Sequence, residues 1–272
     1  MKIRAISALV AVLVFVAIYW FFRTNGLFFI GIVVIFASIY EYGRLTFRPE
    51  LAPRSLRWSF VILCASLFLT TVFVEKPVAS IAQASIYFLT IVLFNVTSRR
   101  DLGISVQLQG AGLMGFLYVG LFPALALRLL KFPVGDVWFF GLLAIVFAGD
   151  TMAYITGRFF GRRKLFESVS PKKTVEGAIG GLVGSALAGV VIAQFLPPEA
   201  SSWMMIAAAT ITGAFAQIGD LNESLLKRVA DVKDSGSIMP GHGGMLDRLD
   251  GVLFAAPVYF SLVSFLVSRS GI

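Results

Sequence analysis

Long apolar stretches separated by short polar segments run along most of the chain. A helix needs about 17 to 25 largely apolar residues to cross about 30 Å of hydrocarbon, and nine stretches reach or approach that length. They are residues 6–22, 27–40, 58–74, 78–96, 110–127, 137–157, 175–196, 203–219 and 251–267, of which the second is the shortest. The pattern predicts an all-α polytopic membrane protein with about nine transmembrane helices.

The basic residues fall unevenly between the two sides that nine crossings would define. Of the 23 Lys and Arg residues, 18 lie on the side that holds the N-terminus and 5 on the other. Because loops rich in Lys and Arg stay in the cytoplasm, we expect a cytoplasmic N-terminus and an external C-terminus. Merging or dropping one helix would reverse every later loop and weaken the asymmetry. The predicted location is the inner (cytoplasmic) membrane, with the active site on the cytosolic side.

Composition narrows the class of protein further. The chain is 58% hydrophobic and 14% charged, which is more apolar than a soluble core requires. Its formal charge of +8 is better explained by membrane topology than by nucleic acid, so no nucleic-acid partner is expected. The single cysteine, Cys64, excludes an intramolecular disulfide and a zinc-binding thiol cluster. Residues 6–22 lack a small-x-small cleavage site and are interpreted as a retained first helix.

Asp150 is the clearest polar residue inside a predicted helix. It lies about 10 Å from the cytosolic end of stretch 137–157, at 1.5 Å per residue. A carboxylate at this depth is costly and indicates a functional site by default. Pairing with an interhelical Arg or a hydroxyl is the structural alternative.

A basic loop precedes the stretch 175–196. Within it, Ser170-Pro171-Lys172-Lys173-Thr174 brings hydroxyls and two ammonium groups to a predicted turn before a helix. Backbone N–H groups, the helix dipole and Lys side chains at such a position converge on phosphate oxygens. The segment is not a Walker P-loop. For the neighbouring Arg162, Arg163 and Lys164, a purely topological role is an equal alternative.

Small residues recur every fourth position on the helix that follows this loop. They are Gly177, Gly181, Ser185 and Gly189. A stripe of this kind is typical of close helix packing in lipid, and we assign it no chemistry.

The densest group of polar residues lies between the last two predicted helices. Asp220 ends one helix while Asp247 and Asp250 open the next, so we expect their carboxylates to converge at one membrane face. Asp247 and Asp250 are spaced i, i+3, and the helix N-terminus favours anions. Three such carboxylates suit Mg²⁺, which binds a few carboxylates together with phosphate oxygens and water. A second cation is an open alternative.

Other charged residues of this region have simple structural explanations. Glu223 and Lys227 stand at i, i+4, where an ion pair on the helix surface is expected. Asp231 and Asp234 are consistent with solvated loop charge. His242, the only histidine, lies between glycines, where a polar loop residue is an equal alternative to a phosphate contact or proton carrier.

Four ordered motifs of this tract resemble the signature of the phosphatidate cytidylyltransferase family. They are Ser224-x-x-Lys227-Arg228, Lys233-Asp234, His242-Gly243-Gly244 and Asp247-Arg248-x-Asp250. Upstream, Asp150, Ser170-Pro171-x-Lys173-Thr174 and Gly219-Asp220-Leu221 resemble further blocks of that family in the same order. The resemblance covers residues 147–250.

The resemblance implies that the protein converts CTP and phosphatidate to CDP-diacylglycerol and pyrophosphate, and that the reaction depends on Mg²⁺. It also implies a multi-span protein that is similar to others working as homodimers. The expected catalytic residues are Asp150, Lys173, Asp220, Lys227, Arg228, Asp247 and Asp250. The residues expected to bind substrate phosphates are Ser170, Lys172, Lys173, Thr174, Ser224, Lys227, Arg228, His242 and Arg248. The expected Mg²⁺ ligands are Asp220, Asp247 and Asp250.

These assignments divide the chain into two functional regions. Residues 1–136 are interpreted as a scaffold of five helices, and residues 137–272 as a catalytic region of four helices with cytosolic loops. Two other functions remain open: an ion or solute transporter, and a CTP-dependent lipid kinase. A transporter would need polar residues through the whole membrane thickness, whereas here they crowd the cytosolic half.

Overall fold

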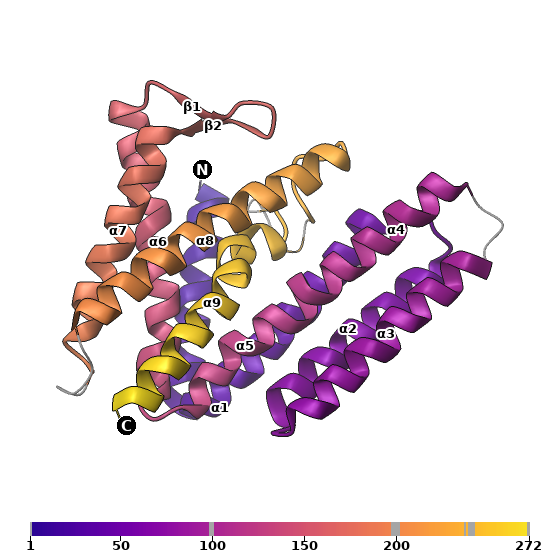
Figure 1. The fold of residues 1–272 in the computed structure, drawn as a ribbon. Helices are drawn as coiled ribbons and strands as arrows, with labels where there is room; N and C mark the ends of the chain where they lie inside the picture. The colour runs from indigo at the N-terminus through magenta and orange to yellow at the C-terminus, as the bar shows by residue number, and fades with distance from the viewer. Residues whose placement is uncertain (1, 98–100, 197–201, 237, 239–242, 271–272) are drawn as a thin grey trace. The chain divides into compact units, whose positions relative to one another are not determined.

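Helices make up most of the computed structural model (Figure 1), which describes residues 2–97, 101–196, 202–236, 238 and 243–270. The α-helices are α1 (Lys2–Thr46), α2 (Arg54–Phe73), α3 (Pro77–Thr97), α4 (Leu102–Gly115), α5 (Phe122–Arg128), α6 (Gly135–Phe160), α7 (Val175–Ala193), α8 (Ser202–Val229) and α9 (Leu246–Ser270). The π-helical turn η1 (Phe116–Leu121) joins α4 to α5, and the 3₁₀ turn η2 (Leu129–Lys131) follows α5. The strands are β1 (Lys164–Phe166) and β2 (Ser170–Thr174).

Seven helical segments within the described residues are long and apolar enough, by length and composition, to cross a membrane. The chain is therefore a polytopic, mainly helical membrane protein. The predicted stretches 6–22 and 27–40 fall on the one long helix α1, so they count as one segment by this measure. The predicted stretch 78–96 corresponds to α3, whose apolar part Val78–Phe94 is shorter than the other seven segments.

Helix α1 is interrupted at one residue. Arg23 has φ 50° and ψ −133°, which lie outside the helical region, so two helical segments meet there. The interruption falls between the first two predicted stretches. The sequence pattern thus located the break, but the chain passes it without a separate loop.

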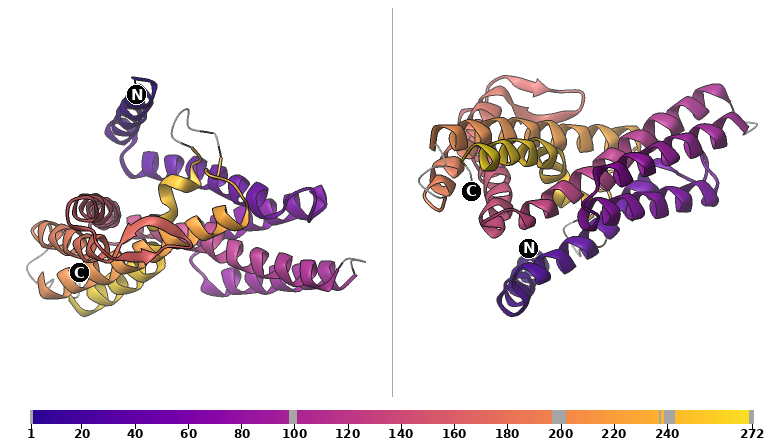
Figure 2. Two further views of the ribbon diagram at one scale, coloured as in Figure 1. Left: turned by 90° about the horizontal axis from the view of Figure 1, so that it is seen from above. Right: turned by 60° about the horizontal axis from the view of Figure 1, so that its bottom comes forward.

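A β-hairpin stands where the sequence predicts a turn in an all-α fold. Strands β1 and β2 pair antiparallel, with Lys164 opposite Thr174 and Phe166 opposite Ser170 (Figures 1 and 2). The prediction of a turn at residues 170–174 is wrong, because pairing with residues 164–166 satisfies the backbone groups in an extended conformation. The following helix begins as expected: the Thr174 hydroxyl caps α7 by accepting a hydrogen bond from Gly177 N at 3.1 Å.

The described chain forms two compact units. The first contains residues 1–124 and 232–248, and the second contains residues 125–231 and 249–272. The predicted division into a scaffold, residues 1–136, and a catalytic region, residues 137–272, is a functional one. It remains a prediction.

Aromatic side chains organise the core of the first unit. The rings of Tyr87 and Phe116 stack with centroids 3.9 Å apart, and those of Tyr42 and Phe60 stack at 5.6 Å. The Tyr42 hydroxyl donates to the Ala111 carbonyl at 2.8 Å, and the Tyr87 hydroxyl donates to a carbonyl on the same helix α4 at 2.9 Å. These bonds satisfy the polar ends of two buried aromatics and fix α1 and α3 against α4.

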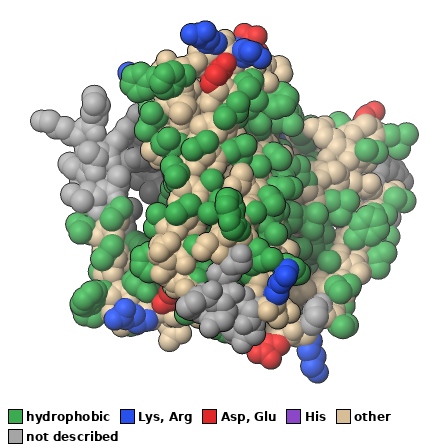
Figure 3. Space-filling view, turned by 60° about the vertical axis from the view of Figure 1, so that its left-hand side comes forward, with side chains coloured by type: hydrophobic (Ala, Val, Ile, Leu, Met, Phe, Trp, Pro, Cys, Tyr) green, Lys and Arg blue, Asp and Glu red, His purple; other side chains and the backbone are tan. Residues whose placement is uncertain are grey.

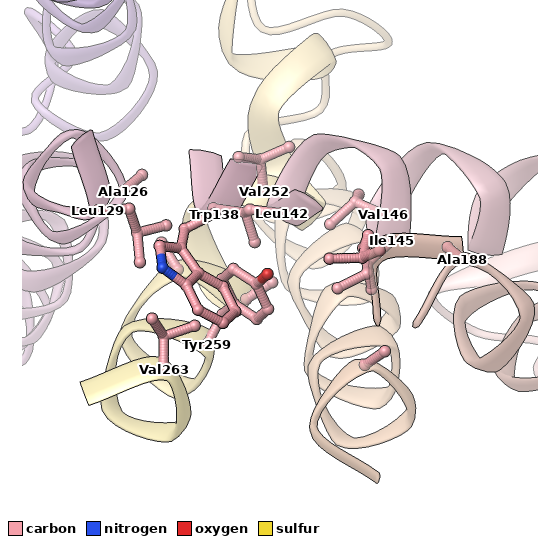
Figure 4. Close-up of a cluster of buried hydrophobic side chains, with 14 of the residues drawn as sticks. Ala126, Leu129, Trp138, Leu142, Ile145, Val146, Ala188, Val252, Tyr259 and Val263 are labelled. Atoms are coloured by element: carbon pink, nitrogen blue, oxygen red, sulfur yellow. The ribbon is translucent and has the colours of Figure 1, made fainter. Parts of the chain in front are cut away.

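The core of the second unit is built from α6, α7, α8 and α9 together with the residues before α6 (Figure 4). Trp138 and Tyr259 are fully buried there and are surrounded by aliphatic side chains. The Trp138 indole donates to the Pro133 carbonyl at 3.0 Å, which ties the start of α6 to the loop before it. Burial of side chains this large accounts for much of the packing energy of the unit.

The small-residue stripe on α7 packs as predicted. A Cβ atom at Gly184 would lie 2.6 Å from the Ala148 carbonyl oxygen, and one at Gly181 would lie 3.2 Å from the Gly149 carbonyl oxygen, both on α6. Ser185 is fully buried and donates to the Ile145 carbonyl at 3.0 Å. Only small side chains allow α6 and α7 to approach this closely, so the packing prediction is confirmed.

Hydrophobic side chains predominate on the face drawn in Figure 3, where charged side chains are few. Along α7, Ile179, Val183, Leu187 and Val191 are all at least 49% exposed. A helix with a small-residue face toward its neighbours and large apolar side chains outward suits a lipid environment.

Candidate active site

An ion pair joins the β-hairpin to α8 in the second unit. The ammonium of Lys173, on β2, lies 2.6 Å from a carboxylate oxygen of Asp220, on α8. The two side chains are 25% and 37% exposed, so the pair is partly accessible. Such a contact holds the strand that carries Ser170-Pro171-Lys172-Lys173-Thr174 against the helix that carries Gly219-Asp220-Leu221.

Two further carboxylates lie close enough to Asp220 to interact with it electrostatically. Asp150 on α6 and Asp250 on α9 both interact electrostatically with Asp220 and with each other. A Cβ atom at Gly219 would lie 2.5 Å from the Asp250 carbonyl oxygen, so the backbones of α8 and α9 nearly touch at this level. The structure therefore brings together Asp150, Asp220 and Asp250, which we call the carboxylate cluster. Asp150 lies ten residues before the end of α6, about 15 Å along the helix, because α6 continues three residues beyond the predicted stretch 137–157.

Lysines counter the negative charge of this cluster. Lys173 interacts with Asp150 as well as with Asp220, and Lys227 interacts with Asp250. Lys227 also forms the expected i, i+4 ion pair with Glu223, whose side chain is fully buried. The structural interpretation of Glu223 and Lys227 is confirmed, and Lys227 is at the same time near the carboxylate cluster.

The remaining residues predicted to bind phosphate on the hairpin and α8 differ in their contacts and exposure. Arg228 donates from Nε to the Val169 carbonyl at 3.3 Å, which docks the hairpin turn on α8 (Figure 2). Lys172 is exposed, Ser170 and Ser224 are half-buried, and Thr174 is buried as the cap of α7.

Asp247 belongs to a hydrogen-bond network in the first unit. One of its carboxylate oxygens accepts from Ser235 N at 2.8 Å, Ser235 Oγ at 2.9 Å and Gly244 N at 2.8 Å. The Ser235 hydroxyl is also 3.2 Å from a carboxylate oxygen of Glu41 on α1, and that oxygen accepts from Leu246 N at 2.9 Å. We call Glu41, Ser235, Gly244, Leu246 and Asp247 the Glu41 network.

Glu41 and Ser235 are the residues that the sequence analysis missed. The signal for Glu41 was present, because it is an acid at the end of an apolar stretch, where a carboxylate is functional by default. Ser235 lies in a polar loop and offers no signal of its own. Among the other predicted residues, Arg248 is exposed, and His242 lies outside the described residues.

The carboxylate cluster has the donor chemistry that Mg²⁺ prefers. Among the described residues, no three Asp, Glu, His or Cys side chains are arranged to hold a metal ion as they stand.

The fold and the cluster define a membrane protein with a charged site of carboxylates and lysines among its helices, which is typical of an enzyme acting on phosphate-bearing substrates. Comparison with known proteins identifies it more closely. A profile described as "Cytidylyltransferase family" matches residues 2–266, and the chain belongs to this family.

Named relatives agree with that assignment. The phosphatidate cytidylyltransferase of Staphylococcus haemolyticus is 31% identical over 269 residues, which cover 95% of this chain and 97% of the relative. That of Staphylococcus saprophyticus is 46% identical over 114 residues, 42% of this chain and 44% of the relative. That of Synechocystis sp. is 42% identical over 139 residues, 50% of this chain and 46% of the relative.

Proposed function

We propose that this protein transfers CMP from CTP to phosphatidate, forming CDP-diacylglycerol and pyrophosphate for phospholipid biosynthesis. The observation that carries the proposal is 31% identity over 95% of the chain to a phosphatidate cytidylyltransferase. The carboxylate and lysine residues described above supply the charges that the reaction needs. Both substrates are polyanions, so the main barrier to their encounter is electrostatic repulsion.

The reaction requires one bond to form and one to break at phosphorus. A phosphate oxygen of phosphatidate attacks the α-phosphorus of CTP, and the bond from that phosphorus to the bridging β-phosphate oxygen breaks, so pyrophosphate leaves with the electron pair. A phosphomonoester with a second pKa of about 6 is already largely a dianion near neutral pH. The protein therefore needs no strong general base, and its task is to neutralise and align the two substrates.

Lysines and arginines of the second unit are suited to the substrate phosphates. Lys173 and Lys227 stand beside carboxylates and are partly accessible, at 25% and 19% exposure. In the proposed reaction Lys173 exchanges its Asp220 partner for a substrate phosphate. Arg228 and the hydroxyls of Ser170 and Ser224 complete this set of donors. Arg248, which belongs to the first unit, is a further proposed phosphate ligand.

The proposed ligands of Mg²⁺ are Asp220 and Asp250 of the carboxylate cluster, together with Asp247, which precedes Asp250 by three residues on α9. Bound there, Mg²⁺ would supply positive charge to the triphosphate of CTP. A second cation is part of the proposal as an alternative. Asp150, the deepest acid, orients Lys173, with which it interacts.

The proposed topology has nine crossings, with the N-terminus in the cytosol and the active site on the cytosolic side of the inner membrane. It requires both segments of α1 and the whole of α3 to cross. Helix α3 has 21 residues, about 31 Å at 1.5 Å per residue, which is long enough for hydrocarbon. The 18 to 5 distribution of basic residues supports this orientation.

A homodimer is the proposed assembly. The exposed apolar side chains of the helices are compatible with a second copy as well as with lipid. Chemical cross-linking of the protein in native membranes, followed by mass spectrometry, tests it: contacts between identical residues support a dimer, and their absence at high cross-linking yield contradicts one.

Labelled CTP tests the proposed reaction directly. Purified protein in lipid vesicles containing phosphatidate is supplied with α-labelled or γ-labelled CTP and Mg²⁺. We expect label in the lipid only from α-labelled CTP, with pyrophosphate released. Label in lipid from γ-labelled CTP would instead identify a lipid kinase. No lipid label from either, combined with solute uptake, would identify a transporter.

A further inference from the structure

Glu41 is a buried carboxylate near the end of α1, where the expected chemistry gives it no role. Only 3% of the residue is exposed. Burying a carboxylate is costly unless hydrogen bonds compensate for the lost water. One of its oxygens accepts bonds from the Leu246 backbone and the Ser235 hydroxyl, at 2.9 and 3.2 Å.

The partners of Glu41 are far away in sequence and belong to the segment that carries Asp247. Leu246 is the first residue of α9, so Glu41 satisfies a backbone N–H at the start of that helix. Ser235 lies in the segment 232–248, which the first unit contains together with α1. Glu41 therefore holds both ends of this segment.

Glycines allow the segment to approach the Glu41 side chain. A Cβ atom at Gly236 would collide with the Glu41 carboxylate, and one at Gly244 would collide with it and with the Ser235 hydroxyl. The close approach explains why these two positions have no side chain. It also places the Gly244 N–H where it donates to Asp247 at 2.8 Å.

Ser235 couples Glu41 to Asp247. Its hydroxyl lies 3.2 Å from a Glu41 oxygen and 2.9 Å from an Asp247 oxygen, and its one proton is donated to one of them at a time. Its backbone N–H donates to the same Asp247 oxygen. The orientation of the Asp247 carboxylate thus depends on where Glu41 holds the segment.

We propose that Glu41 is a positioning residue, which anchors residues 232–248 to α1 and thereby sets the orientation of Asp247. The inference rests on the proposed function for its effect on catalysis, although the anchoring itself does not. Glu41 acts by accepting hydrogen bonds. The second Glu41 oxygen is buried and has no hydrogen-bond partner among the described residues, so an amide group is expected to fit in its place.

Substitution of Glu41 in the full-length protein tests this role. Glu41→Ala removes both bonds, whereas Glu41→Gln keeps an oxygen for Leu246 and Ser235. The matched control is Ser38→Ala: Ser38 is fully buried one turn earlier on α1, and its hydroxyl donates only to the Val34 carbonyl of its own helix, at 3.0 Å.

Two readouts separate positioning from a general structural effect. In CMP transfer from α-labelled CTP, we expect Glu41→Ala to raise the Mg²⁺ concentration for half-maximal activity about tenfold or more, and Glu41→Gln to stay within about threefold of the parent. In amide hydrogen exchange, the peptide covering residues 232–248 should exchange faster in Glu41→Ala, while the Ser38→Ala protein should match the parent.

Distinct results would overturn the proposal. Unchanged exchange of residues 232–248 in Glu41→Ala contradicts the anchoring, and equal impairment of the Gln and Ala variants shows that charge, not hydrogen bonding, matters. Should Glu41→Ala fail to fold, Ser235→Ala takes its place, because it removes the hydroxyl that lies between Glu41 and Asp247. Faster exchange of residues 232–248 in this variant supports the proposal, and unchanged exchange contradicts it. An inactive parent protein would refute the proposed function, while the exchange measurement would still decide the anchoring.

Discussion

At the scale of single residues, the ion pair of Lys173 and Asp220 neutralises two charges and leaves both side chains partly accessible. Their ion pair, at 2.6 Å, neutralises an ammonium and a carboxylate that would be costly apart. The same pair keeps both groups available, because each remains partly exposed. In the proposed reaction, a substrate phosphate replaces Asp220 as the partner of Lys173, and Asp220 then becomes a ligand of the cation.

The first prediction concerns Asp220. Replacing it with Asn should lower CMP transfer by at least about 100-fold, since a ligand for the cation and the partner of Lys173 are lost together. The matched control is Asp231→Asn, the same substitution at an exposed loop position, which should leave activity within about twofold. Chelation followed by Mg²⁺ addition should restore the parent but not Asp220→Asn. Equal activity of the two variants would contradict the assignment.

The second prediction compares two neighbouring lysines. Lys173 is ion-paired within the site, whereas Lys172 is exposed on the same strand. Lys173→Met should therefore reduce the rate of CMP transfer about tenfold more than Lys172→Met, because it removes a charge held at the carboxylate cluster. Steady-state kinetics with varied CTP and phosphatidate measure the difference. A larger loss from Lys172→Met would show that the exposed lysine is the phosphate ligand.

At the scale of elements, the hairpin β1–β2 joins the site to the helix pair α6–α7. It is held at its turn by the bond from Arg228 to the Val169 carbonyl, and near its open end by the ion pair of Lys173 with Asp220. At this open end, Glu176 on α7 also accepts from the backbone of Arg162 and Arg163 at 2.9 and 3.2 Å. The position of strand β2 therefore depends on the close packing of α6 against α7.

The third prediction tests that packing. Gly184→Leu should destabilise the protein by about 1–3 kcal/mol, because its side chain would enter the space occupied by Ala148 and Met152 of α6. Val183→Leu places the same side chain on the adjacent position, which is 49% exposed, and should be nearly neutral. Thermal unfolding in detergent measures both. Equal melting temperatures would show that α6 and α7 do not need the small residue.

At the scale of the whole molecule, the number of crossings depends mainly on α1. Its interruption at Arg23 divides it into two segments, and the proposed nine crossings require the exposed Asn25 to reach the external side. If α1 crossed only once, the same residue would lie within the bilayer.

The fourth prediction uses the single cysteine of the chain. In a Cys64→Ala background, Asn25→Cys and Glu75→Cys should react with a membrane-impermeant maleimide on intact cells, whereas Ser55→Cys should react only after the cells are lysed. Cys64 is buried in α2, and its replacement by Ala removes background labelling. Labelling of Ser55→Cys on intact cells would reverse the proposed orientation, and protection of Asn25→Cys before and after lysis would contradict nine crossings.

Much of the fold and part of the site followed from local sequence properties. Apolar stretches of membrane length predicted the helices, because backbone groups in lipid must be satisfied within each helix. The four-residue spacing of Gly177, Gly181, Ser185 and Gly189 predicted a packing face on α7. Asp150, Asp220 and Asp250 were identified because intramembrane or helix-end carboxylates are rare without a function.

Only the tertiary structure decided how these parts meet. The hairpin forms because residues 164–166 satisfy the backbone of Ser170–Thr174, and Lys173 acquires its partner because β2 lies on α8. Glu41 meets Ser235 and Leu246 across 194 and 205 residues, separations at which no local pattern records a contact. The sequence by itself therefore determined a helical membrane protein with the residues of a cytidylyltransferase, since these depend on composition and short spacing. The pairing of its charges depends on packing between distant segments, which only the folded chain provides.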